Sequence, residues 1–188
     1  LLRTDRAFRG LALFRTVMAL GMVPFPFLAP CALEHLDAEP SISGTFVGTF
    51  MTASILVNLI WARMSDRYGN RMVLFCASLF CVVVPALALG ALYAQDVLGS
   101  GSLVPMALMT GAVIGSALVH TAYLMGHINY LLEIAPGPLR PTYLGTVELI
   151  LLPAALFPVL GGVLASLLSY QAVFVLALMA GLLLFWLS

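Results

Sequence analysis

One stretch of the chain carries polar side chains at the spacing of a single helix face. Its members are separated by four, three, four and three residues, and they are Ser116, His120, Tyr123, His127 and Tyr130. Such a face either lines a path for a solute or for protons, or it forms hydrogen bonds between packed helices. The two histidines lie two turns apart, about 10 Å along the axis, which is too far for one metal ion without other ligands. We therefore expect no metal site.

Two charged residues lie inside long apolar stretches. Arg15 lies a little over one turn into the first stretch, and Glu148 lies about two turns into the fifth. Arg15 either extends its guanidinium group to the membrane interface, pairs with a structural partner or contacts a substrate. A carboxylate inside a membrane is costly unless it is paired or protonated. Glu148 is therefore expected to carry protons, to form a structural ion pair or hydrogen bond, or to contact the substrate.

The sequence lacks the signals of a soluble enzyme. It contains no glycine-rich phosphate loop, no HExxH pair and no paired-cysteine site. Ser116 and His120 could meet on one helix as in a hydrolase, but no nucleophile elbow or oxyanion hole accompanies them. The cysteines show neither metal spacing nor a disulfide framework, and inert packing is expected for Cys31, Cys76 and Cys81. We expect no enzyme activity, no cofactor and no nucleic-acid partner.

The elements that carry these residues are expected to be membrane-spanning helices. Of the 188 residues, 62% are hydrophobic and 9% are charged, whereas a soluble domain has about 25% charged residues. A spanning helix needs about 20 mostly apolar residues, and six such runs occupy residues 10–30, 42–62, 72–95, 103–130, 142–164 and 170–187. The runs do not alternate as membrane strands do. The predicted fold class is an all-α membrane protein, with bends where prolines lie in the first and fifth helices.

The charges between the six runs fall on two sides. All the bases outside the runs lie on one side, at Arg3, Arg6, Arg9, Arg63, Arg67, Arg71 and Arg140. The other side has acids and no base, at Glu34, Asp37, Glu39 and Asp96. Because basic residues stay on the cytoplasmic side of a membrane, both termini are expected in the cytoplasm. The expected location is the plasma or inner membrane.

The loop between the second and third runs has a distinctive order of charges. It reads Arg63-Met64-Ser65-Asp66-Arg67-Tyr68-Gly69-Asn70-Arg71 and resembles the cytoplasmic signature of the major facilitator superfamily, approximately Gly-x-Leu-Ala-Asp-Arg-x-Gly-Arg-Arg. Four positions match in place, namely Asp66, Arg67, Gly69 and Arg71. Ala62 stands where the family usually has glycine, and Asn70 stands where a base is common. In that family a weaker copy of the signature links the eighth and ninth helices, and these departures suit that copy.

The resemblance extends over nearly the whole chain. Residues 129–136 and 140–145 are similar to the segment joining the tenth and eleventh helices, and residues 161–162 and 170–174 are similar to the junction of the eleventh and twelfth. The resemblance implies the C-terminal half of a transporter, a 3+3 inverted repeat of six helices. Residues 1–188 would then be one domain cut from a twelve-helix chain.

The resemblance also implies roles for individual residues. The family's seventh and tenth helices line the central cavity, which would place Arg15 and the stripe of Ser116, His120, Tyr123 and His127 there. The eighth and eleventh helices form the interface with the N-terminal half. The aspartate that corresponds to Asp66 contacts the N-terminus of the eleventh helix, near Thr142, and latches the outward-facing state together with the rest of the signature.

The expected function is therefore secondary active transport of a small solute by alternating access, with protons as a candidate coupling ion. The expected partners are a small-molecule substrate, the lipid bilayer and an N-terminal six-helix half of the same chain. The alternative is a freestanding six-helix module that pairs with itself or serves as a non-transporting subunit. Six further apolar spans upstream of Leu1 in the gene would favour transport, and a nearby start codon would favour the alternative.

Overall fold

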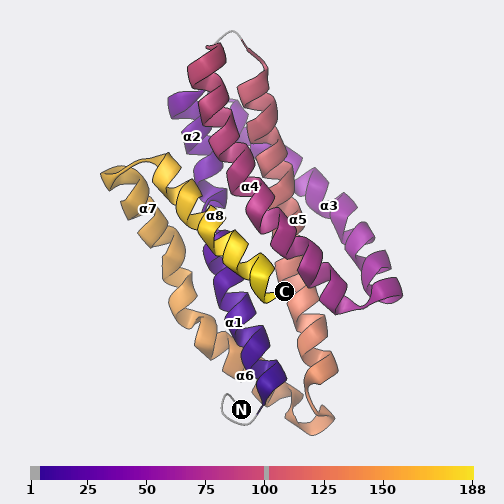
Figure 1. The fold of residues 1–188 in the computed structure, drawn as a ribbon. Helices are drawn as coiled ribbons and strands as arrows, with labels where there is room; N and C mark the ends of the chain where they lie inside the picture. The colour runs from indigo at the N-terminus through magenta and orange to yellow at the C-terminus, as the bar shows by residue number, and fades with distance from the viewer. Residues whose placement is uncertain (1–4, 100–101) are drawn as a thin grey trace.

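The computed structural model describes residues 5–99 and 102–188, and Arg3 lies outside the described residues. Within these two ranges the chain is helical and has no strand (Figure 1). With η denoting a short 3-10 helix, the elements in chain order are α1 (Arg6–Gly21), η1 (Phe25–Phe27), α2 (Leu28–His35), α3 (Ile42–Tyr68), α4 (Asn70–Leu98), α5 (Val104–Ile134), η2 (Gly137–Leu139), α6 (Arg140–Leu151), η3 (Leu152–Leu156), α7 (Phe157–Leu167) and α8 (Tyr170–Leu187).

Six helical stretches are long and apolar enough to cross a membrane. They comprise Arg6–His35, Ile42–Tyr68, Asn70–Leu98, Val104–Ile134, Gly137–Leu167 and Tyr170–Leu187. The predicted fold class, an all-α membrane protein with six spanning helices, is confirmed. In Figure 1 the start of α1, the α3–α4 junction and the start of α6 lie toward the lower part of the view, and α2 lies near the top. We call these the basic end and the acidic end, after the charges that they carry.

Two of the spans are interrupted at prolines. The first span breaks between α1 and α2, where Pro24 precedes the turn η1 and Pro26 lies inside it. The fifth span breaks between α6 and α7, where Pro153 lies in η3 and Pro158 lies at the start of α7. A proline has no backbone N–H and clashes with the preceding turn of a helix. Both breaks therefore follow from the sequence.

The helices α4 and α5 form the centre of the bundle, with α3 against α5 and α8 against α4 (Figure 1). The buried side chains of α4 along this contact are small, and they include Ala77, Cys81, Val84, Ala88 and Ala91. In lipid, small side chains allow helix backbones to approach closely, and packing then drives helix association. Cys31 and Cys81 are both buried free thiols.

A hydrogen-bonded clasp joins the beginning of α1 to α6. The Asp5 carboxylate accepts the backbone N–H of Phe8 at 3.0 Å, which caps α1, and it accepts the Tyr143 hydroxyl at 2.6 Å. The rings of Phe8 and Tyr143 meet edge-on with 5.0 Å between their centroids. The hydroxyl of Tyr143 and the N–H of Phe8 favour the charged carboxylate and lower the pKa of Asp5. The clasp fixes α1 against α6 and thereby aligns the charged residues farther along both helices.

The packing of α8 on α4 depends on Gly181. A methyl group added there would collide with the backbone of Cys81 and Val82. We expect Gly181→Ala to destabilise the complete protein by about 1–3 kcal/mol, the usual cost of overpacking, as measured by thermal unfolding in detergent. Gly90→Ala is the matched control, because a methyl group there meets only Leu108 at 3.8 Å. Equal unfolding temperatures for the two variants would contradict the close packing of α8 on α4.

Candidate solute site

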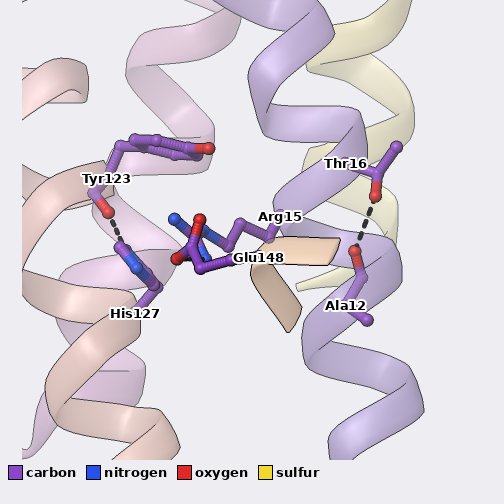
Figure 2. A network of polar contacts seen from close by, with 6 residues as sticks. All are labelled: Ala12, Arg15, Thr16, Tyr123, His127 and Glu148. Atoms are coloured by element: carbon purple, nitrogen blue, oxygen red, sulfur yellow. Dashed lines mark hydrogen bonds and ion pairs between the residues drawn. The ribbon is translucent and has the colours of Figure 1, made fainter. Parts of the chain in front are cut away.

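An ion pair joins α1 to α6 inside the membrane-spanning stretches. The Nη1 atom of Arg15 donates to Oε1 of Glu148 at 2.7 Å (Figure 2). Arg15 is only 5% exposed, whereas the side chain of Glu148 is 59% exposed. A guanidinium group keeps its charge in proteins, and a buried charge is strongly destabilising without a partner. Glu148 is the carboxylate that meets this need.

Tyr123 and His127 of α5 complete the surroundings of Arg15. The guanidinium carbon of Arg15 lies 5.0 Å from the centroid of the Tyr123 ring, a cation–π contact. The Nδ1 atom of His127 contacts the backbone carbonyl of Tyr123. Because a carbonyl only accepts, Nδ1 carries a proton, and in the neutral form of the ring Nε2 is then an acceptor. Figure 2 shows these residues of α1, α5 and α6 gathered in one place.

Two buried polar atoms of this cluster lack hydrogen-bond partners. Within residues 5–99 and 102–188, Nε of Arg15 and Nε2 of His127 make no hydrogen bond, and His127 is only 2% exposed. Buried polar atoms are nearly always paired with protein or with ordered water. The cluster therefore has one spare donor and one spare acceptor, which is the pattern of a site that takes up a polar solute or water.

Ser116 and His120 precede Tyr123 in α5 and lie toward the acidic end. The Ser116 hydroxyl donates to the Ala112 carbonyl at 2.8 Å, so its proton is used within its own helix. The His120 ring meets Phe50 of α3 edge-on, with 5.5 Å between centroids. The predicted stripe therefore divides into two parts: Tyr123 and His127 join Arg15 and Glu148, whereas Ser116 and His120 do not contact that ion pair.

An apolar pocket of about 310 Å³ opens between the start of α2, α3 and α5. We call it the aromatic pocket, and the residues that line it include Phe25, Pro26, Phe46, Phe50, Met51 and Ser116. His120 lies beside it through its contact with Phe50. Along α5, therefore, an apolar pocket at Ser116 is followed by the charged cluster at Tyr123 and His127.

The signature loop is a tight junction between α3 and α4. Gly69 has φ of +85°, a conformation that other residues rarely adopt, so it allows α4 to begin directly after α3 ends. Asp66, Arg67 and Arg71 are exposed. Asp66 lines a small hollow of about 130 Å³ with Trp61 and other residues of α3, α4 and α5. Among the described residues, Asp66 has no hydrogen bond or ion pair, so its predicted latch to the start of α6 stays a prediction.

The structure adds a polar bridge that sequence reasoning missed. Asn70, which is 7% exposed, donates to Oε1 of Glu133 at 2.5 Å and accepts the Ser65 hydroxyl at 2.6 Å. The bridge ties the α3–α4 junction to the end of α5. The signal in the sequence was Asn70 itself, which stands where the signature commonly has a base. Its partner, Glu133, is an acid near the end of α5. Close by, the Trp61 indole donates to the Thr121 hydroxyl at 3.0 Å and anchors α3 on α5.

The family model described as Major Facilitator Superfamily matches residues 11–188. The chain belongs to the major facilitator superfamily. No curated protein and no solved structure matches it. The matched range includes Arg15, Glu148 and the whole polar stripe. Membership makes the protein a multi-pass membrane transporter of the major facilitator type, in a family whose members bind small molecules within the membrane and are transporters rather than enzymes.

The polar bridge predicts a specific loss of stability. We expect Asn70→Leu to lower the free energy of unfolding of this major facilitator protein by about 1.5–3 kcal/mol, because Glu133 loses a charge-assisted hydrogen bond. Thermal unfolding in detergent measures the effect. Asn129→Leu is the control, since Asn129 is exposed on the neighbouring α5 surface and surface changes usually stay within about 0.5 kcal/mol. If the two variants unfolded alike, the bridge would carry no stability.

Proposed function

We propose that this chain forms the C-terminal six-helix half of a secondary active transporter, which moves a small solute by alternating access and is driven by protons. The observation that carries the proposal is the 2.7 Å ion pair between Arg15 and Glu148, on two different spanning stretches. Because Arg15 keeps its charge, Glu148 is the member of the pair that takes up a proton. Protonation of Glu148 breaks the pair and frees the middle of α1 to move relative to α6, while the clasp of Asp5 and Tyr143 holds the two helices together at the basic end.

The groups around Glu148 support its role as the proton carrier. From α1 it pairs with Arg15, whose guanidinium group also lies against the Tyr123 ring of α5. On its own helix Tyr143 is already bonded to Asp5. The short elements η2 and η3, which pack against α6, contain no titratable residue. His127, in the same cluster, offers a second proton acceptor through Nε2, which makes no hydrogen bond among the described residues.

The exposed helices support pairing with an N-terminal half. Only 17% of the apolar window of the Ile42–Tyr68 stretch and 11% of that of the Gly137–Leu167 stretch are buried. At Gly44 and Gly48 of α3, an added methyl group would meet nothing within 4 Å. Such open small residues allow another helix to approach closely. We propose that these faces pack against the other half, and that lipid covers the remaining apolar surface.

The distribution of charge supports one orientation in the membrane. Apart from Arg15, the arginines that the structure describes lie at the basic end. They are Arg6, Arg9, Arg63, Arg67, Arg71 and Arg140. We propose that this end faces the cytoplasm of the cell, in the plasma or inner membrane, because short cytoplasmic loops are enriched in basic residues. Both ends of the six-helix unit would then be cytoplasmic.

The signature loop is proposed as a conformational latch. The first turn of α6 has Leu139 at its N-cap position, with no side-chain hydrogen bond to the free N–H groups. Asp66 is an exposed acid at the same end of the bundle, and a carboxylate is stabilised at a helix N-terminus. In this proposal Asp66 docks there in one state of the cycle, while Gly69 permits the tight turn and Arg67 and Arg71 hold the loop at the membrane surface.

The proton-coupling proposal predicts a pH-dependent conformational equilibrium that requires Glu148. In the complete natural protein in nanodiscs, spin labels across the basic end measure the inward/outward ratio without any substrate. We expect this ratio to change about 5- to 150-fold between high and low pH, the usual range of coupling. Glu148→Gln should hold the low-pH ratio at every pH, because glutamine resembles the protonated acid. Proton-driven solute uptake should be lost in Glu148→Gln. The same uptake should be weakened in His120→Ala.

Glu39→Gln is the matched control for that experiment, since Glu39 is an exposed acid at the opposite end. It should keep the full pH response of the natural protein. A pH response that survives in Glu148→Gln would remove Glu148 from the coupling mechanism.

The latch proposal predicts a change of balance without a change of selectivity. Asp66→Asn should shift the inward/outward ratio of the complete protein, because a neutral amide interacts more weakly with the start of α6. The relative uptake of competing solutes should stay unchanged. Asp96→Asn, the same change at an exposed site at the acidic end, should alter neither property. Altered selectivity in Asp66→Asn with an unchanged ratio would refute the latch.

A further inference from the structure

We infer that the solute is an amphipathic organic anion, whose carboxylate-like group replaces Glu148 on Arg15 and whose apolar part enters the aromatic pocket. The inference rests on the proposed transport function and names the substrate class of the same site. The juxtaposition that carries it lies along α5, where a buried, permanently charged guanidinium group contacts Tyr123 and an apolar pocket lies about two turns earlier, at Ser116.

The charge of the solute follows from Arg15. The guanidinium group is nearly excluded from water and cannot lose its proton. When Glu148 is protonated, Arg15 therefore needs another anion, since an uncompensated buried charge is strongly unfavourable. A cationic solute would add a second positive charge beside Arg15, and a neutral solute would leave the first one uncompensated. The solute anion and the charged Glu148 thus alternate as partners of Arg15.

The free atoms of the cluster fit an anionic group. Within the described part of the chain, Nε of Arg15 has no partner while Nη1 is bound to Glu148. A carboxylate binds a guanidinium group best through two parallel N–H donors, and Nε offers one that is not yet used. The free Nε2 of His127 adds an acceptor for a hydroxyl or amide N–H next to the anionic group.

The apolar part of the solute follows from the aromatic pocket. Its volume of about 310 Å³ lies within the range of small-molecule pockets, about 300–1,000 Å³. Phe25, Phe46 and Phe50 line it, together with Ser116 of α5. Ser116 and Tyr123 are seven residues apart on the same helix face, about 10 Å along the axis. A solute of about that length reaches from the pocket to the guanidinium group.

The test uses the purified complete protein and a matched set of probes: 4-phenylbutyrate, 5-phenylvalerate, 4-phenylbutyramide, 4-phenylbutylamine and butyrate. Binding is measured by thermal shift over a range of pH. We expect the two arylalkanoates to bind, with affinity that rises as the pH falls, and the amide, the amine and butyrate to bind far more weakly. Binding that is equal for the amide or the amine, or absent for both arylalkanoates, would overturn the inference.

Variants assign the binding to the two parts of the site. Arg15→Gln should weaken arylalkanoate binding by about 30-fold or more, because it removes the buried charge with which the carboxylate pairs. Arg15→Lys keeps the charge and should keep the preference for carboxylates, which guards against a folding defect in the first variant. Phe50→Ala should weaken the arylalkanoates and leave the affinity for butyrate unchanged. Unaltered binding in both Arg15 variants would contradict the site.

Glu148→Gln separates this inference from the proposed function. Its arylalkanoate affinity should be high and independent of pH, because the competing carboxylate is gone. If the amine binds best while the spin-label ratio still depends on Glu148, the substrate class is wrong and proton coupling stands. If arylalkanoates bind through Arg15 while the ratio ignores Glu148, the substrate class stands and proton coupling is wrong.

Discussion

A guanidinium group that is kept from water is strongly destabilising unless it has a partner, and in this protein that constraint links three of the spanning stretches. The side chain of Arg15 extends from α1 to contact residues of α5 and α6, and its counter-ion Glu148 belongs to a helix that is distant in the sequence. Tyr123 adds a ring face to the cation. In the proposed mechanism, movement of α1 relative to α6 changes the partner of this charge and thereby couples protonation, solute and conformation.

The surrounding structure holds this pair in register and leaves room for movement. At the basic end, the clasp of Asp5 and Tyr143 joins α1 to α6, and the bridge from Asn70 to Glu133 joins the α3–α4 junction to α5. Toward the acidic end, the proline breaks divide both spans that carry the ion pair. The pair thus lies in helices that are fixed near one end and bent near the middle, an arrangement suited to alternating access.

The fold was predictable from the sequence because membrane thickness sets the length of each apolar run and proline chemistry sets the breaks. The site was predictable only in part. Helical periodicity grouped Tyr123 with His127, but it also included Ser116, whose proton is used by the Ala112 carbonyl. Pairing Arg15 with Glu148 required the relative rotation and register of two helices, which local patterns do not contain. The family signature singled out Gly69, whose positive φ suits a glycine, while its part in a latch stays a prediction.

The claim at the centre of this account is that Glu148 takes up the proton that separates it from Arg15. Infrared difference spectroscopy on the complete protein measures this directly, because acidification creates the absorption band of a protonated carboxyl group. The account predicts a band that appears with the same pH dependence as the conformational change and is missing from Glu148→Gln. An identical band in the natural protein and in Glu148→Gln would contradict it.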